Sequence, residues 1–204
     1  MKKLFALITL ALLTSISTFS AFAYGPQDIS LGTPGYAGTG CPNGSASVTL
    51  APDKKSLSIL FDQYVATAGG TTGKSLDRKT CNLAVPVHVP QGYSISVFKI
   101  DYRGYVNVPV GGSGTFNVEY FFAGIRAPQY TKTFSGGHDG EYVLSDGLVG
   151  RAFVWSACGQ DVNLRVNSSM LVRSNRGFED AMGTVDSIDI KAGMVYHIQW
   201  RECR

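Results

Sequence analysis

The sequence predicts an all-β chain that folds as a single-domain antiparallel β-sandwich of jelly-roll or immunoglobulin-like type, with about ten to twelve short strands. Apolar and polar residues alternate in many short runs, which is the period of a strand with one buried face. The 24 glycines and 8 prolines separate these runs in the manner of turns. No stretch has the period of an amphipathic helix, so a fold built of strands alone is expected.

The first residues have the features of a signal peptide, which we place at residues 1–23. Two lysines precede an apolar run from Leu4 to Leu13, and a Ser/Thr-rich stretch leads to Ala21-Phe22-Ala23, a small-x-small cleavage site. The apolar run is short for a membrane span, so no membrane insertion is expected after cleavage. We therefore predict a secreted or periplasmic protein, with residues 24–40 as an extended, Gly- and Pro-rich arm and residues 41–204 as the sandwich.

The alternation assigns further strands and loops along the chain. A first hairpin is expected to turn at Pro52-Asp53, and Gly-rich segments are expected to form loops. The predicted strands are 47–50, 57–64, 115–122, 130–134, 141–144, 151–156, 162–172, 185–190 and 194–202, and the main predicted loops are 68–77 and 175–183.

The stretch from Cys81 to Tyr105 has the clearest pattern. Its first run places Leu83, Val85, Val87 and Val89 on one face, and Pro90-Gln91-Gly92 then reverses the chain, which predicts a hairpin. In the second run, the apolar positions change phase by one residue after Val97. A change of phase of this kind predicts a β-bulge.

The four cysteines predict two disulfides. An exported chain with an even number of cysteines is expected to oxidise them in pairs, and three pairings exist for Cys41, Cys81, Cys158 and Cys203. We favour Cys41 with Cys81 and Cys158 with Cys203, because each bond then closes one compact part of the chain. The spacing contains no CxxC or HxxxH pattern, so no metal site or other cofactor is predicted.

The charge balance argues against nucleic acid as a partner. Removing the leader takes 2 of the 18 basic residues and none of the 15 acidic ones, so the mature chain has a formal charge of 16 minus 15, or +1. Its Lys and Arg residues are mostly scattered singly, whereas a phosphate-binding surface usually has them clustered.

Aromatic residues provide the most useful indication of function. Their number exceeds what one inward face requires, and exposed rings beside polar side chains can stack on sugars or anchor a protein. We therefore predict a non-enzymatic module that binds a glycan or a surface protein, with the ligand contacts Tyr102, Arg103, Tyr105 and Phe121. The sequence leaves the oligomeric state open.

Two other functions stay open at this stage. A secreted hydrolase of polysaccharide or cell wall requires two facing carboxylates, and loose acidic clusters such as Glu179-Asp180 supply candidates. A structural coat or matrix component is the third hypothesis. Neither a G-x-S-x-G motif nor an oriented pair of nucleophile and base is present, so no catalytic residue is assigned.

Several short motifs are distributed over nearly the whole mature chain: Gly40-Cys41-Pro42, Phe61-Asp62-Gln63-Tyr64, Cys81-Asn82-Leu83, Pro90-Gln91-Gly92-Tyr93, Tyr102-Arg103-Gly104-Tyr105, Trp155-Ser156-Ala157-Cys158-Gly159 and Trp200-Arg201-Glu202-Cys203. Together they resemble a family of exported bacterial and fungal proteins, domain-of-unknown-function family 4360. The family resemblance implies secretion, paired cysteines and one domain, and it brings no catalytic residues. Ala157 stands where this family often has Pro, which weakens a turn.

Overall fold

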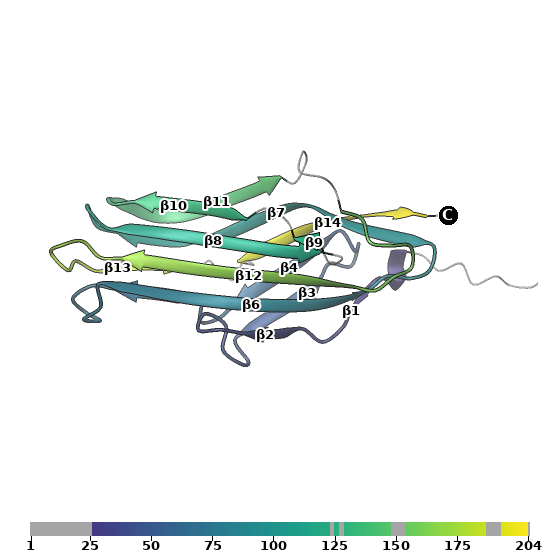
Figure 1. Ribbon diagram of the computed structural model, residues 1–204, viewed down its shortest axis with the longest axis horizontal. Coiled ribbons are helices and arrows are strands. Elements are labelled where there is room, and N and C mark those ends of the chain that lie inside the picture. Colours follow the sequence, from purple (N-terminus) through teal and green to yellow (C-terminus); the bar gives the residue numbers. More distant parts are fainter. Residues whose placement is uncertain (1–25, 123–124, 127–128, 148–153, 187–192, 204) are drawn as a thin grey trace, which may run out of the picture.

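A computed structural model describes residues 26–122, 125–126, 129–147, 154–186 and 193–203. The described residues form two antiparallel sheets that pack face to face, which confirms the predicted β-sandwich (Figure 1). Besides a short 3₁₀ helix, η1 (Pro26–Asp28), they contain fourteen strands. Without the three shortest strands, eleven remain, which matches the predicted number. The expected signal peptide lies outside the described residues.

Each sheet contains seven strands. Sheet 1 has the order β1-β6-β12-β8-β10, with β2 also on β6 and β9 on β8. Sheet 2 has the order β3-β4-β14-β7-β13-β5, with β11 on the other side of β7. The strands of sheet 1 are β1 (Ser30–Leu31), β2 (Gly35–Ala37), β6 (Leu76–His88), β8 (Ser113–Phe122), β9 (Ile125–Arg126), β10 (Tyr130–Ser135) and β12 (Val162–Arg173), and those of sheet 2 are β3 (Ala46–Leu50), β4 (Ser56–Phe61), β5 (Val65–Ala68), β7 (Tyr93–Val108), β11 (His138–Gly147), β13 (Ala181–Thr184) and β14 (Met194–Glu202).

The core lies between the two sheets and is filled by alternate side chains of their long strands. Along β8, every second residue from Gly114 to Phe122 is buried, while the residues between them face outward. Aromatic rings from both sheets meet in this layer: the Tyr102 ring centroid lies 5.2 Å from that of Phe116 and 5.4 Å from that of Tyr130. The inner faces therefore interdigitate as in other aligned sandwiches.

The predicted hairpin between Leu83 and Tyr105 is wrong in one respect, because β6 and β7 belong to different sheets. The turn at Pro90–Gly92 carries the chain across the end of the sandwich instead of pairing the two strands. Both strands have one buried face and share the core, so period-two alternation cannot distinguish a hairpin from a crossing between sheets. The predicted bulge is confirmed: the register of β7 against β14 shifts by one residue, at Phe98.

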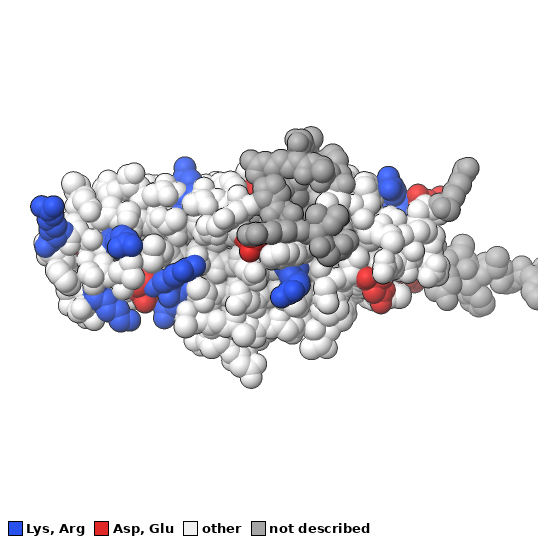
Figure 2. Space-filling view, viewed as in Figure 1, with Lys and Arg blue, Asp and Glu red and all other residues white. Residues whose placement is uncertain are grey.

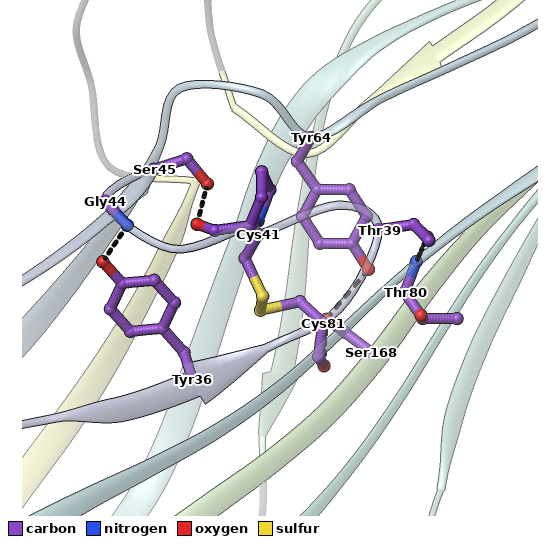
Figure 3. The surroundings of a disulfide bond; sticks show 10 residues. Tyr36, Thr39, Cys41, Gly44, Ser45, Tyr64, Thr80, Cys81 and Ser168 are labelled. Atoms are coloured by element: carbon purple, nitrogen blue, oxygen red, sulfur yellow. Dashed lines mark hydrogen bonds between the residues drawn. A yellow bond between two sulfur atoms is a disulfide. The ribbon is translucent and has the colours of Figure 1, made fainter.

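The two disulfides join Cys41 with Cys81 and Cys158 with Cys203, the favoured pairing. Figure 3 shows the first, which fastens the chain after β2 to strand β6. Buried Tyr64 lies beside it, and the Tyr64 hydroxyl is 3.0 Å from Ser168 Oγ of β12. The first disulfide thus lies inside the sandwich, where it links the edge of sheet 1 to the core.

Several local predictions have a mixed outcome. The predicted first hairpin is present as β3 and β4, and β8 covers the predicted strand 115–122. The arm predicted at 24–40 includes β1 and β2, which both pair with β6. The end of the predicted loop 175–183 belongs to strand β13. Parts of the predicted strands 151–156 and 185–190 lie outside the described residues, and Val154–Ser156 is irregular.

Candidate functional site

Tyr102 is the first of the predicted contact residues, and the structure places it in the core. Its side chain is fully buried between the sheets, where it stacks on Tyr130. Burial raises the pKa of its hydroxyl well above the ordinary value. On β7, Tyr102 belongs to the inward set of alternate residues, so its ring is not presented on either outer face.

The other three predicted residues do not form one site. Arg103 and Tyr105 are half-buried on the outer face of sheet 2, whereas Phe121 is half-buried on the outer face of sheet 1. The sandwich lies between them. Sequence alternation identifies which residues point away from the core, but two strands in different sheets point away from it in opposite directions.

The outer face of sheet 2 around Arg103 and Tyr105 is occupied by contacts among its own side chains. The Tyr105 hydroxyl donates a hydrogen bond to Asp139 on β11, and this bond is the main reason why the pKa of Tyr105 is raised. Nearby, Asp101 lies 2.7 Å from His197 Nε2 and 3.0 Å from Lys99 Nζ, and it accepts a 2.5 Å hydrogen bond from Ser145.

The Asp101 cluster, made of Asp101, Lys99, Ser145 and His197, joins three strands. Partial burial raises the pKa of Asp101, but hydrogen bonds from Ser145, His197 and Lys99 outweigh it and hold the pKa below its ordinary value. Ser145 and His197 both contact the carboxylate, so the cluster lacks the contact between hydroxyl and imidazole that nucleophilic catalysis requires. Its evident effect is to connect β7 with β11 and β14.

A polar hollow lies on the opposite side of the molecule, on the outer face of sheet 1. It has a volume of about 320 Å³. The residues that line it come mainly from β6, β8 and β12, and nearly all carry an amide, hydroxyl or charged group: Arg78, Thr80, Asn82, Asn117, Glu119, Gln129, Asn167, Ser168 and Ser169. We call this region the polar hollow.

The register of sheet 1 explains how the hollow arises. Ser169 lies between Thr80 and Asn117 across the strands, and in the next row Asn167 lies between Asn82 and Glu119. Residues directly opposite one another in an antiparallel sheet have neighbouring side chains on the same face. Short polar side chains in adjacent rows thus leave a shallow depression over a rigid backbone.

Two asparagines of the hollow have free hydrogen-bonding capacity. Among the described residues, the side chains of Asn82 and Asn167 have no hydrogen-bond partner within the protein, while Asn117 donates to Thr131 Oγ1 at 3.0 Å. A side-chain amide offers two donors and an acceptor in one plane. Such groups can hydrogen-bond to neighbouring hydroxyls of a sugar.

An aromatic ring and a guanidinium lie next to this hollow on the same face. Phe121 follows Glu119 by two positions on β8, so their side chains share a side of the sheet. The Arg165 guanidinium carbon lies 5.9 Å from the centre of the Phe121 ring. Of the four residues predicted from the sequence, Phe121 is the one that adjoins the hollow.

The sequence contained a signal for the hollow that the prediction did not use. Asn82, Asn117 and Asn167 all fall on the polar face of an alternating run, and Asn is among the residues depleted in β-strands. What the sequence lacked was the pairing of these strands in one sheet, which brings the three amides together.

A second depression, of about 460 Å³, lies at the loop end of sheet 2. Its walls include Ala68, Ala181 and Met182, and its polar residues Thr71 and Asp180 hydrogen-bond to each other. It therefore presents fewer unengaged polar groups than the polar hollow. Among the described residues, no cluster of three or more His, Cys, Asp or Glu side chains is arranged to hold a metal ion.

Comparison with known proteins places the chain in a family. An "Uncharacterized secreted protein" of Arthroderma benhamiae is 36% identical over 169 residues, which cover 82% of this chain and 69% of that protein. A solved structure described as TmCBM61 in complex with beta-1,4-galactotriose covers 83% of this chain and 88% of its own, with 9% identity. Its TM-score is 0.28, too low to bear on fold or ligand.

The cellular location agrees with the sequence prediction. The fungal relative is a secreted protein and the chain has two disulfides, so the protein is secreted or periplasmic. In the described ranges, no helix has the length and apolar character needed to cross a bilayer. Residues 27–203 match the model of one family, and the chain belongs to it: the family described as Domain of unknown function (DUF4360).

Proposed function

We propose that this exported protein is a non-enzymatic module that binds carbohydrate in the polar hollow on the outer face of sheet 1. The observation that carries the proposal is the meeting of Asn82, Asn117 and Asn167 in adjacent rows of one rigid sheet. Binding sites built on sheets hold their side chains more precisely than sites on loops. Sugars present many hydroxyls at short intervals, and planar amides satisfy such groups in pairs.

The neighbouring Phe121 supports the same function. Its ring lies beside the amides on the outer face, where one side of a sugar ring can stack on it. The Arg165 guanidinium carbon lies 5.9 Å from the centre of that ring, within the range of a cation–π contact.

The composition of the hollow favours binding over hydrolysis. Glycoside hydrolysis commonly requires two carboxylates, one on each side of the scissile bond. Among the nine described residues that line the hollow, Glu119 is the one that bears a carboxylate. A site with this composition can hold a sugar but lacks the acid and base pair of that mechanism.

A glycan array that carries neutral and acidic oligosaccharides tests this function with the mature protein. Asn82→Ala/Asn167→Ala and Phe121→Ala are each expected to weaken binding to the glycans that the unaltered protein recognises, by about tenfold or more. Arg103→Ala and Tyr105→Ala, on the opposite face, are the matched controls and are expected to bind normally. Thermal melting of each variant shows whether it is folded.

Two results would contradict the proposal. The first is an unaltered protein that binds no glycan on the array. The second is loss of binding in the Arg103 and Tyr105 variants with normal binding in the three sheet 1 substitutions, which would place the site on sheet 2.

A further inference from the structure

The two outer faces differ in the balance of their charged residues. At the outward positions of β6, β8, β10 and β12, three arginines stand against one carboxylate, Glu119. Figure 2 shows this face, which is mostly uncharged, with more basic than acidic patches. On sheet 2, the outward positions of β7 and β11 carry both signs, with Lys99 and Arg103 near Asp101, Asp139 and Glu141. The three arginines at the outward positions of β6 and β12 are Arg78, Arg165 and Arg173.

The three arginines are available to a ligand. All are exposed, and none forms an ion pair with another described residue. The Arg78 Nη2 donates a 3.3 Å hydrogen bond to Ser169 Oγ, and Arg165 lies over the Phe121 ring. A guanidinium held in this way keeps further N–H groups free for a carboxylate or sulfate.

Two of these arginines lie at opposite ends of the polar hollow. Arg78 is opposite Leu171 on β12, and Arg165 lies six residues away along the same strand. Six residues of a strand span about 20 Å. The rows that contain Asn82, Asn167 and Ser169 lie between the two cations, so hydrogen-bonding groups separate the two positive charges along the strand direction; Glu119 shares the row of Asn167.

We infer, on the basis of the carbohydrate-binding function proposed above, that the ligand is an acidic polysaccharide with carboxylate or sulfate groups at intervals along the chain. Arg78 and Arg165 bind the acidic groups, and the asparagines between them bind the hydroxyls of the intervening sugars. Nucleic acid is the less suitable polyanion, because phosphate contacts use clustered basic residues, whereas Arg78 and Arg165 are separated by rows of amide and hydroxyl groups that also contain Glu119.

Equilibrium binding to four polymers tests the inference. Polygalacturonate supplies carboxylates, heparin supplies sulfates, dextran is the neutral polymer, and duplex DNA is the other polyanion. We expect the mature protein to bind polygalacturonate or heparin at least about tenfold more tightly than dextran or DNA. Raising NaCl from 50 to 500 mM is expected to weaken that binding by about tenfold.

Substitutions then locate the contacts. Arg78→Gln and Arg165→Gln are each expected to weaken binding to the acidic polymer by about threefold to tenfold and to reduce its salt dependence. Arg103→Gln on sheet 2 removes the same charge from the opposite face, and we expect it to bind as the unaltered protein does. Arg165→Lys keeps the charge but not the planar fork, so partial rescue is expected.

The possible outcomes separate this inference from the function on which it rests. Equal affinity for dextran and the acidic polymers, without a salt effect, overturns the inference and leaves carbohydrate binding intact. Preference for DNA overturns it as well. Absence of binding to every polymer and to the glycan array overturns both proposals.

Discussion

On the outer face of sheet 2, Asp101 contacts Lys99, Ser145 and His197, and Tyr105 contacts Asp139. On the outer face of sheet 1, by contrast, the side chains of Asn82 and Asn167 have no partner within the described part of the protein. Both faces arise from the same alternation of polar and apolar residues along long strands. They differ in whether the polar groups bind one another or leave room for a ligand.

This difference shows that polar content alone does not identify a site. Sheet 2 has the more perturbed groups, with the lowered pKa of Asp101 and the raised pKa of Tyr105, yet those shifts come from contacts that join strands. Perturbed pKa values mark structural networks as well as functional sites. Our proposal therefore rests on the free hydrogen-bonding groups of sheet 1 and not on the perturbed groups of sheet 2.

The Tyr102 side chain lies in the core between the two outer faces. Its substitution should have the largest effect on the free energy of unfolding. Its side chain is fully buried, so we expect Tyr102→Ala to lower the free energy of unfolding by about 3–5 kcal/mol. Among the described residues the Tyr102 hydroxyl has no hydrogen-bond partner, so Tyr102→Phe should keep or slightly raise the stability. Urea denaturation measures both.

The two Tyr102 variants also test whether Tyr102 is a core residue or a surface contact. If Tyr102→Ala kept full stability but lost glycan binding, Tyr102 would be a surface contact and the description of the core would be wrong. Glycan binding by Tyr102→Phe equal to that of the unaltered protein is the expected companion result.

Each of the two disulfides lies near a different sheet. Cys81 immediately precedes Asn82 on β6 of sheet 1, whereas Cys203 follows β14 of sheet 2. Their sequence separations are 40 and 45 residues, so in the chain-entropy model each bond stabilises the fold by about 4 kcal/mol. We expect Cys41→Ser/Cys81→Ser and Cys158→Ser/Cys203→Ser to lose similar amounts of stability, measured by urea denaturation.

Glycan binding should distinguish the two double variants. At a temperature where both are folded, the Cys41/Cys81 variant is expected to bind more weakly, because the edge of sheet 1 beside the hollow is no longer fastened to the chain after β2. The Cys158/Cys203 variant should bind normally. Equal loss in both would mean that general stability, and not the local position of β6, controls the hollow.

The sequence was sufficient for the fold class, which follows from period-two alternation, and it favoured the observed disulfide pairing among three that were possible. It also located the bulge at Phe98, since a bulge shifts the apolar phase. The candidate site could not be predicted as completely from the sequence. Alternation says that Tyr105 and Phe121 are outward but not that they lie on opposite sheets, which depends on long-range pairing.

The same dependence on long-range strand pairing explains why the three asparagines of the polar hollow were not predicted. Asn82, Asn117 and Asn167 are far apart in the chain, and each alone resembles an ordinary solvated position. They become neighbours through the pairing of β12 with β6 and β8, which sets them in adjacent rows. No local signal encodes that register, because it is fixed by the packing of whole strands.

Compared with Tyr102→Ala and the disulfide variants, Asp101→Asn is expected to change stability less, and it distinguishes the two outer faces most directly. Because the folded-state pKa of Asp101 is below its ordinary value of 3.8, its contribution to stability is complete above that value and is lost as the pH falls through the folded-state pKa. We expect Asp101→Asn to lower the free energy of unfolding by about 1–2 kcal/mol at pH 7. The difference from the unaltered protein should shrink as the pH falls below 3.8 and through the folded-state pKa.

Asn117→Ala is the matched change on sheet 1. The Asn117 side chain lines the hollow and donates one exposed hydrogen bond to Thr131, so its loss should cost at most about 0.5 kcal/mol of stability at either pH while weakening glycan binding. Asp101→Asn should do the reverse, with lower stability and normal binding. If Asp101→Asn weakened glycan binding as strongly as Asn117→Ala, the polar groups of sheet 2 would also serve a ligand, and the contrast between a self-contained face and a binding face would fail.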